Sequence, residues 1–251
     1  MSRIESFKQA LSEKRAVKII AGIDNFDAEK VRKVVNAASM SGASAIDICA
    51  DSEIISMARS MTELPLFVSS IDPEELCHAV SLGADAVELG NFDALYKKGQ
   101  TFSASQILSL AKRTRELIGS DVFFCVTIPG ELEISEQIEL ARELESIGVN
   151  LIQTEGHFSN ESPSNGVRGL LERAELTISN TIELTRNIET PIMTATGINP
   201  TTASLAFAAG ASAIGCGSCV NKLDSELSML AVSKSLVEIA EKNAHHIYEL
   251  V

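Results

Sequence analysis

A short phrase recurs four times along the chain and constrains its fold more than any other feature. The copies are Gly42-Ala-Ser-Ala-Ile, Gly83-Ala-Asp-Ala-Val, Gly148-Val-Asn-Leu-Ile and Gly210-Ala-Ser-Ala-Ile. Each copy follows an amphipathic helical pattern and opens an apolar run. A glycine just past a helix end adopts a left-handed backbone at little cost. The phrase therefore predicts a helix that ends and turns directly into a strand.

Other apolar runs lie between these copies, and together they predict eight strands, each followed by a helical pattern. The predicted strands are 17–24, 45–50, 66–70, 86–90, 122–128, 151–155, 192–196 and 213–217. Regular βα alternation indicates a parallel sheet, and 251 residues match the roughly 250 of an eight-fold barrel. We predict a single (βα)8 TIM barrel over residues 16–251, preceded by a short N-terminal helix in residues 1–15, rather than an open doubly wound sheet.

The repeat also predicts which side chains face the barrel axis, because strand side chains alternate between the two faces. The residues four and six positions after each glycine, such as Ile46 and Ile48, are mainly apolar and should face the helices. The residues five and seven positions after it should then point inward. These inward positions are Asp47, Glu88, Gln153, Gly215, Cys49, Gly90, Glu155 and Gly217, with Lys18, Gly22 and Asp24 on the first strand. The barrel interior is therefore predicted to be unusually polar.

The last two βα units carry a pattern typical of a phosphate site. In this fold, phosphate commonly binds at the loops after the seventh and eighth strands. Gly197 and Gly217 would let an anion approach the backbone, Ser218 begins a helical turn whose positive end favours an anion, and Lys222 adds charge. We predict that these four residues bind phosphate. The alternative is that the glycines serve only the turns.

Several carboxylates are predicted to converge on the barrel axis. Asp24, Glu88 and Glu155 are candidates for general acid/base catalysis on a phosphorylated substrate, with Asp24 and Glu155 nearest the mouth. Like charges this close cannot all be ionised in a dry interior. The alternative is a buried network with Lys18 and Asp47 that merely fills the barrel.

Two loops at the predicted mouth share a triplet of residues, and a third loop is long and polar. The triplet Asn25-Phe26-Asp27 after the first strand recurs as Asn91-Phe92-Asp93 after the fourth. Helix capping explains part of this echo, and a shared ligand-facing role would explain the rest. A polar loop over 158–169, preceded by His157, is a candidate lid, because long loops in compact domains tend to be functional.

Composition excludes several classes of protein. The formal net charge is -13 and no Lys/Arg-rich run exists, so we expect no nucleic-acid partner. No apolar run approaches the roughly 20 residues of a membrane span, so we expect no membrane association. The five cysteines are odd in number, which favours free thiols in a reducing compartment. The pair Cys216 and Cys219 lacks a second pair or nearby histidines, so we predict no metal site.

The chain resembles one family closely, the hypothetical chloroplast reading frame numbered twenty-three of plastid genomes and cyanobacteria. The matching stretches are 18–27, 68–70, 87–93, 152–156 and 217–223, of which Asn-Phe-Asp and Gln-Thr-Glu-Gly are fairly specific. Cys219 stands where a small residue such as alanine is expected. The resemblance implies a phosphate-binding barrel in the plastid (chloroplast) stroma or in the cytoplasm of a cyanobacterium. It implies no activity, cofactor or oligomeric state.

Two classes of function follow from these features. The first is an enzyme, an isomerase, lyase or synthase that acts on a small phosphorylated metabolite. The second is a non-catalytic barrel that binds a phosphometabolite or flavin mononucleotide and acts through a partner protein. The residues themselves leave the choice between the two open, and they leave the cofactor open as well.

Overall fold

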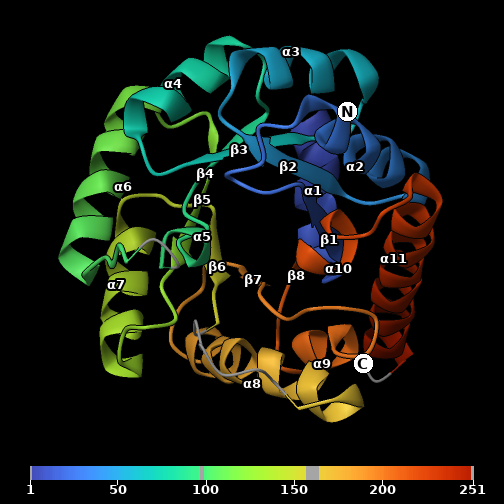
Figure 1. Ribbon diagram of the computed structural model, residues 1–251. Coiled ribbons are helices and arrows are strands. Elements are labelled where there is room, and N and C mark those ends of the chain that lie inside the picture. Colours follow the sequence, from blue (N-terminus) through green and yellow to red (C-terminus); the bar gives the residue numbers. More distant parts are fainter. Residues whose placement is uncertain (1, 97–98, 157–163, 250–251) are drawn as a thin grey trace.

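The computed structural model describes residues 2–96, 99–156 and 164–249, which form a closed barrel of parallel strands in the order β1 to β8 (Figure 1). Helices surround the ring of strands. The strands are β1 (Ala16–Ile20), β2 (Ala45–Cys49), β3 (Leu66–Ser70), β4 (Ala86–Leu89), β5 (Phe123–Ile128), β6 (Leu151–Thr154), β7 (Ile192–Thr194) and β8 (Ala213–Cys216). The helices are α1 (Arg3–Ser12), α2 (Ala28–Ser41), α3 (Ser52–Met61), α4 (Pro73–Ser81), α5 (Asp93–Tyr96), α6 (Ala104–Ile118), α7 (Ile134–Ser146), α8 (Gly166–Thr185), α9 (Ala203–Ala208), α10 (Ser218–Asn221) and α11 (Glu226–Glu249). The predicted (βα)8 barrel with its N-terminal helix is confirmed.

The four repeated glycines lie where the helical patterns end. Their φ angles are +83° at Gly42, +100° at Gly83, +78° at Gly148 and +102° at Gly210. A residue with a side chain rarely adopts these backbone angles, because its Cβ would approach the backbone too closely. The recurring phrase therefore marks left-handed turns that lead into β2, β4, β6 and β8.

Two strands end two or more residues earlier than predicted. β1 ends at Ile20 instead of residue 24, because Gly22 at φ +118° turns the chain out of the sheet. β7 ends at Thr194, because Thr196 and Gly197 adopt φ +66° and +74°. Both departures occur at the C-terminal ends of strands. Loop backbone, rather than strand, therefore forms the mouth of the barrel at these two positions.

The predicted phase of the strands is confirmed by the packing on the outer side. Ile46 and Ile48 lie in one apolar cluster between strands and helices, and Val87 and Leu89 lie in another. Thr154 is a polar residue at one of these outward-facing positions, and its hydroxyl forms hydrogen bonds with threonine hydroxyls of α8. The opposite faces of these strands are thereby directed into the barrel.

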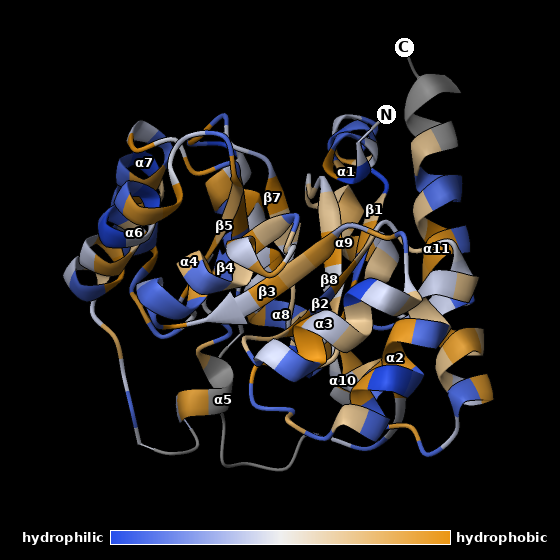
Figure 2. Ribbon diagram, turned by 90° about the horizontal axis from the view of Figure 1, so that it is seen from above, coloured by the Kyte–Doolittle hydropathy of each residue, from blue (hydrophilic) through white to orange (hydrophobic). Residues whose placement is uncertain are grey.

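The helix α1 closes the N-terminal end of the barrel, opposite the end where α5 and α10 lie (Figure 2). Its Phe7 is fully buried and contacts two phenylalanines from the bottom layer of the interior. The ring centroids lie 5.0 Å apart for Phe7 and Phe67 and 5.7 Å apart for Phe7 and Phe123. Edge-to-face aromatic packing of this kind fills the base of the barrel. Only the C-terminal end is left for a site.

The longest helices, α8 and α11, are amphipathic covers of the barrel rather than uniformly apolar segments. In the part of the chain that the structure describes, no helix combines the length and apolarity needed to cross a bilayer.

Candidate functional site

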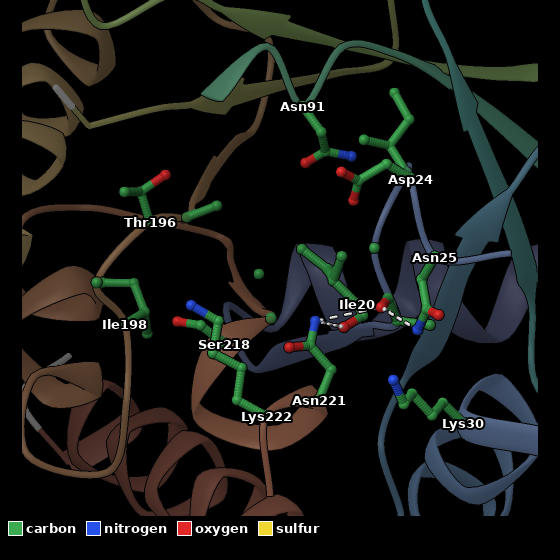
Figure 3. Close-up of a pocket in the computed structure, with 17 residues that line it drawn as sticks. Ile20, Asp24, Asn25, Lys30, Asn91, Thr196, Ile198, Ser218, Asn221 and Lys222 are labelled. Carbon is green, nitrogen blue, oxygen red and sulfur yellow. Dashed lines mark hydrogen bonds between the residues drawn. The ribbon is translucent and has the colours of Figure 1, made fainter. Parts of the chain in front are cut away.

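A pocket of about 440 Å³ opens at the C-terminal ends of the strands, between the loops after β1, β4, β7 and β8 (Figure 3). It is lined by loop backbone and by short polar side chains. The lining residues are Ile20, Ala21, Gly22, Ile23, Asp24, Asn25, Lys30, Asn91, Ala195, Thr196, Gly197, Ile198, Gly215, Gly217, Ser218, Asn221 and Lys222. This is the end of the barrel at which active sites of the fold are found.

The structure brings five of the predicted site residues to this one pocket. Gly197, Gly217, Ser218 and Lys222 line it together with Asp24. They come from the segments that follow β1, β7 and β8, which are far apart in the chain. The other two predicted residues, Glu88 and Glu155, are buried and are absent from the pocket lining. Of the three predicted carboxylates, only Asp24 is among the residues that line this pocket.

Both asparagines of the repeated triplet also line the pocket. Asn25 donates from Nδ2 to the carbonyl of Ala21, 3.1 Å away, and holds the loop after β1. Asn91 adopts φ +65°, a left-handed conformation that asparagine tolerates better than most residues. The loop after β1 also initiates a helix, because Asp27 caps α2. The first copy of the triplet thus combines a helix cap with an asparagine that lines the pocket.

One side of the pocket carries positive charge. Ser218, Asn221 and Lys222 lie there, and Lys30 points toward the same space from the first turn of α2 (Figure 3). Lys30 was not among the predicted site residues. Its position near the mouth of the barrel follows from the sequence, because it comes three residues after the helix cap Asp27. Two exposed lysines, one on α2 and one at the end of α10, therefore lie on this side of the pocket.

Asn221 joins the loop after β8 to the end of β1. Its Nδ2 donates to the carbonyl of Ile20 at 3.0 Å and to that of Ala21 at 3.2 Å. The helix that Ser218 begins, α10, is only four residues long. Its dipole is correspondingly small, so an anion here would depend chiefly on first-turn N–H groups and on lysine charge.

The two predicted glycines have different reasons to be glycine. A Cβ at Gly197 would lie 2.4 Å from the carbonyl oxygen of Arg173 on α8, and its φ is +74°. The turn and the close packing of α8 account for this residue. A Cβ at Gly217 would meet nothing closer than 3.7 Å. Gly217 lines the pocket, and a Cβ there would make only ordinary van der Waals contacts, with Asn221 and Ile20.

Thr196 has a backbone conformation that is costly for a β-branched residue. Its φ is +66°, in the left-handed region where such residues are outliers. Its methyl carbon packs against Gly156, where a Cβ would lie only 2.7 Å away. Its hydroxyl points toward the pocket (Figure 3). Strain of this kind concentrates at ligand sites.

Asp24 occupies a different position from the one predicted. It was expected on the inward face of β1, but it lies in the turn after that strand and is exposed. Its carboxylate and the amide of Asn91 lie on the side of the pocket opposite Ser218 and Lys222 (Figure 3). The pocket therefore has a cationic side and a carboxylate side.

Beneath the pocket lies a fully buried polar network. Lys18 and Glu88 form an ion pair with no exposure of either side chain, and Nε2 of Gln153 donates to Glu88 at 2.9 Å. Burial lowers the pKa of Lys18, but the charges of Glu88 and Asp47 outweigh this effect and hold that pKa above its ordinary value. Burial also raises the pKa of Asp47, to about 7. The predicted network of Lys18 with Glu88 is present.

Glu155 lies behind the pocket. It is 3% exposed, and its Oε2 accepts a hydrogen bond from the hydroxyl of Tyr96 on α5, 3.1 Å away. His157 and residues 158–163 of the candidate lid lie outside the described residues. Across the described ranges, no group of three or more histidine, cysteine or acidic side chains is arranged to hold a metal ion.

The fold and the pocket together define a class: a TIM barrel with a polar pocket at the C-terminal ends of β1, β7 and β8. The chain belongs to the family described as "Protein of unknown function (DUF561)", whose model matches residues 1–246. It is 37% identical to the uncharacterised protein ycf23 of Cyanophora paradoxa over 235 residues, covering 91% of this chain and 93% of that protein. It is also 37% identical to ycf23 of Pyropia yezoensis over 219 residues, covering 87% and 80%. The predicted family resemblance is confirmed.

Solved structures with the same fold include several enzymes. Thiamine phosphate pyrophosphorylase from Pyrococcus furiosus superimposes with a TM-score of 0.61 at 18% identity, covering 93% of this chain and 98% of that one. For 3-hexulose-6-phosphate synthase from Salmonella typhimurium the TM-score is 0.62 at 13% identity, covering 91% and 99%. A truncated 3-deoxy-D-arabino-heptulosonate 7-phosphate synthase from Thermotoga maritima gives 0.63 at 14%, covering 92% and 87%. At these identities the likeness shows the barrel fold alone.

Proposed function

We propose that this protein binds a small phosphorylated metabolite in the pocket at the mouth of the barrel. The observation that carries the proposal is the meeting of Gly197, Gly217, Ser218 and Lys222 in one pocket. Phosphate would lie against Gly217 and the first turn of α10, where no described atom would contact a Cβ closely. The names of three structural neighbours, each an enzyme of a phosphorylated compound, support the same ligand class.

The chemistry that the pocket supports is acid/base catalysis at the end away from the phosphate. Asp24 is the predicted carboxylate that reaches the pocket, and it lies across from Lys222. A ligand anchored by phosphate on the cationic side would present its carbon skeleton to Asp24. Proton transfer by a positioned carboxylate suits an isomerase, a lyase or a synthase. In this proposal Glu88 balances Lys18, and Glu155 supports the loops.

We place the protein in the plastid stroma, or in the cytoplasm of a cyanobacterium. The curated relatives are reading frames of red algae and of Cyanophora that carry the name ycf23. The resemblance of the motifs to that family supports the same location. Localisation of a tagged copy in an alga, with fractionation of stroma and membranes, tests this point.

Isothermal titration with inorganic phosphate, and then with a panel of sugar phosphates, tests the anion site. The variants are Lys222→Gln, which removes charge, and Gly217→Val, which fills the space beside the backbone. Each should weaken phosphate binding about tenfold or more, as expected for a charge-assisted hydrogen bond. Lys112→Gln is the matched control, because Lys112 is exposed on α6 and is not among the residues lining the pocket. Unchanged binding in both pocket variants would refute the proposal.

A further inference from the structure

The amide of Gln153 is held in one orientation by its surroundings. The side chain is 1% exposed, and its Nε2 donates to Glu88, Asn91 and Thr127 at 2.9, 3.1 and 3.0 Å. The carboxylate of Glu88 is paired with Lys18 and only accepts hydrogen bonds. The nitrogen of the Gln153 amide must therefore face Glu88.

The neighbouring bonds enforce the same polarity. The hydroxyl of Ser69 donates to Asp47 at 2.6 Å, and Nδ2 of Asn91 donates to Ser69 at 3.2 Å. The remaining oxygen of the Asn91 amide is then the atom that faces Gln153. Because this oxygen only accepts, Gln153 must donate to it.

The carbonyl oxygen of Gln153 is consequently directed away from the network and has no hydrogen-bond partner among the described residues. Among the described residues nothing donates to Oε1, although it is buried. A buried acceptor without a donor costs about 1–3 kcal/mol, so such an atom calls for an explanation. Asp47 Oδ2, deeper in the barrel, is unpartnered as well, but its carboxyl can carry a proton of its own.

The unpartnered oxygen borders the floor of the pocket. A Cβ placed on Gly215 would lie 3.1 Å from Gln153 Oε1, 3.0 Å from Ala195 Cβ and 3.2 Å from Ile20 Cδ1. Gly215, Ala195 and Ile20 all line the pocket. Ile20 Cδ1, which lies beside the same space at Gly215, is the end of a flexible side chain, so rotation about its last bond changes the room that a ligand has there.

We propose that Gln153 Oε1 accepts a hydrogen bond from the ligand, so that the pocket selects phosphorylated compounds that carry a hydroxyl or amino group at the end remote from the phosphate. This inference rests on the proposed function, because the phosphate anchors the ligand near Gly217. Gly215 and Gly217 are two residues apart, which places the donor about 7 Å from the phosphate-binding backbone. A three- or four-carbon chain spans that interval.

The test compares alkyl phosphates with their hydroxylated counterparts by calorimetry. The probes are propyl and butyl phosphate against 3-hydroxypropyl and 4-hydroxybutyl phosphate. The unsubstituted protein should bind at least one hydroxylated probe about three- to tenfold more tightly than its alkyl partner, the usual value of one hydrogen bond. If none of the four phosphates binds, the anion site itself is wrong and the inference falls with it. If each pair binds equally, only the inference is overturned, as it would be if water satisfies Oε1.

Three variants trace the preference to the amide. Gln153→Met removes the acceptor and should abolish the preference for the hydroxyl while leaving binding of the alkyl phosphates. Gly215→Ala keeps the network and fills the floor, so it should have the same effect even if Gln153→Met does not fold. Ile20→Val removes Cδ1 from the space beside Gly215, gives the ligand more room there and should increase the preference.

The control is Gln137→Met, the same exchange at another buried glutamine. Gln137 on α7 is 2% exposed and donates to the carbonyl of Leu132 at 2.8 Å, outside the pocket lining. It should leave the preference unchanged. A preference for the hydroxyl that survives in both Gln153→Met and Gly215→Ala would show that the donor binds elsewhere and would overturn the inference.

Discussion

Lys18 of β1 and Glu88 of β4 form an ion pair across the inside of the barrel, and neither side chain has any contact with solvent. Lys18 also lies over the ring of Phe67, with its Nζ 5.2 Å from the ring centroid. The pair therefore lies on the apolar base that α1 closes and beneath the polar pocket. Charges so deeply buried persist only when each neutralises the other.

This ion pair predicts a large cost when one partner is neutralised. Glu88→Gln should lower the free energy of unfolding by about 3–5 kcal/mol, because it leaves the buried charge of Lys18 uncompensated. Urea unfolding measures this, with Glu74→Gln at the exposed pair with Arg113 as the control that should change little. A loss no larger than that of the control would mean that the pair does not support the fold.

Asp47 predicts how stability depends on pH. Burial raises its pKa in the folded state to about 7, whereas an aspartate in the unfolded chain has a pKa of about 3.9. Between these two pH values Asp47 holds a proton in the folded protein that it releases in the unfolded chain. The free energy of unfolding therefore falls as pH rises through this window, and Asp47 adds no further pH dependence above it. Asp47→Asn should remove that slope, and its stability relative to the unsubstituted protein should gain about 2–4 kcal/mol from pH 4 to pH 7. Parallel pH curves from urea unfolding of the two proteins would contradict the assignment.

Gly197 and Gly217 should respond oppositely to the same substitution. Gly197→Ala forces a Cβ to 2.4 Å from the carbonyl of Arg173 at φ +74°, which should cost about 1–3 kcal/mol of stability. Gly217→Ala meets nothing within 3.7 Å, so its stability should stay within about 0.5 kcal/mol while phosphate binding weakens. Melting temperature and phosphate titration on both variants check this. A destabilised Gly217→Ala with normal binding would assign Gly217 to the turn alone.

Substitutions of the two carboxylates nearest the mouth should differ in their effects on turnover and on melting temperature. Asp24 is exposed in the pocket, so Asp24→Asn should leave the melting temperature unchanged and lower any turnover found with a phosphorylated substrate by about 10²–10⁴-fold. Glu155 is buried against Tyr96, so Glu155→Gln should lower the melting temperature. Both quantities are measured on the same preparations. Full turnover in Asp24→Asn would end its catalytic assignment.

Much of the barrel could be predicted because its signals are local. The glycine phrase at Gly42, Gly83, Gly148 and Gly210 reflects a backbone angle that each position needs by itself. The alternation after each glycine then separated Ile46, against the helices, from Asp47, inside the barrel. Both follow from sterics and period-two geometry, which act within a few residues of the chain.

The residues that meet in the pocket depended on tertiary structure. Where β1 ended decided whether Asp24 faced the barrel axis or the open mouth, and a turn at Gly22 placed it at the mouth. Lys30 joined the pocket because α2 starts beside α10, a contact between residues some 190 apart in sequence. The role of Gly197 emerged only from the carbonyl of α8 packed against it.

The sequence by itself determined the order of strands and helices, the polarity of the interior and the loops that carry the site, since each follows from short-range backbone geometry. Tertiary structure decided which polar groups find partners. Glu88 pairs with Lys18, whereas the oxygen of Gln153 faces Gly215 without a partner. The reason is that hydrogen-bond satisfaction depends on the relative positions of strands that only barrel closure brings together.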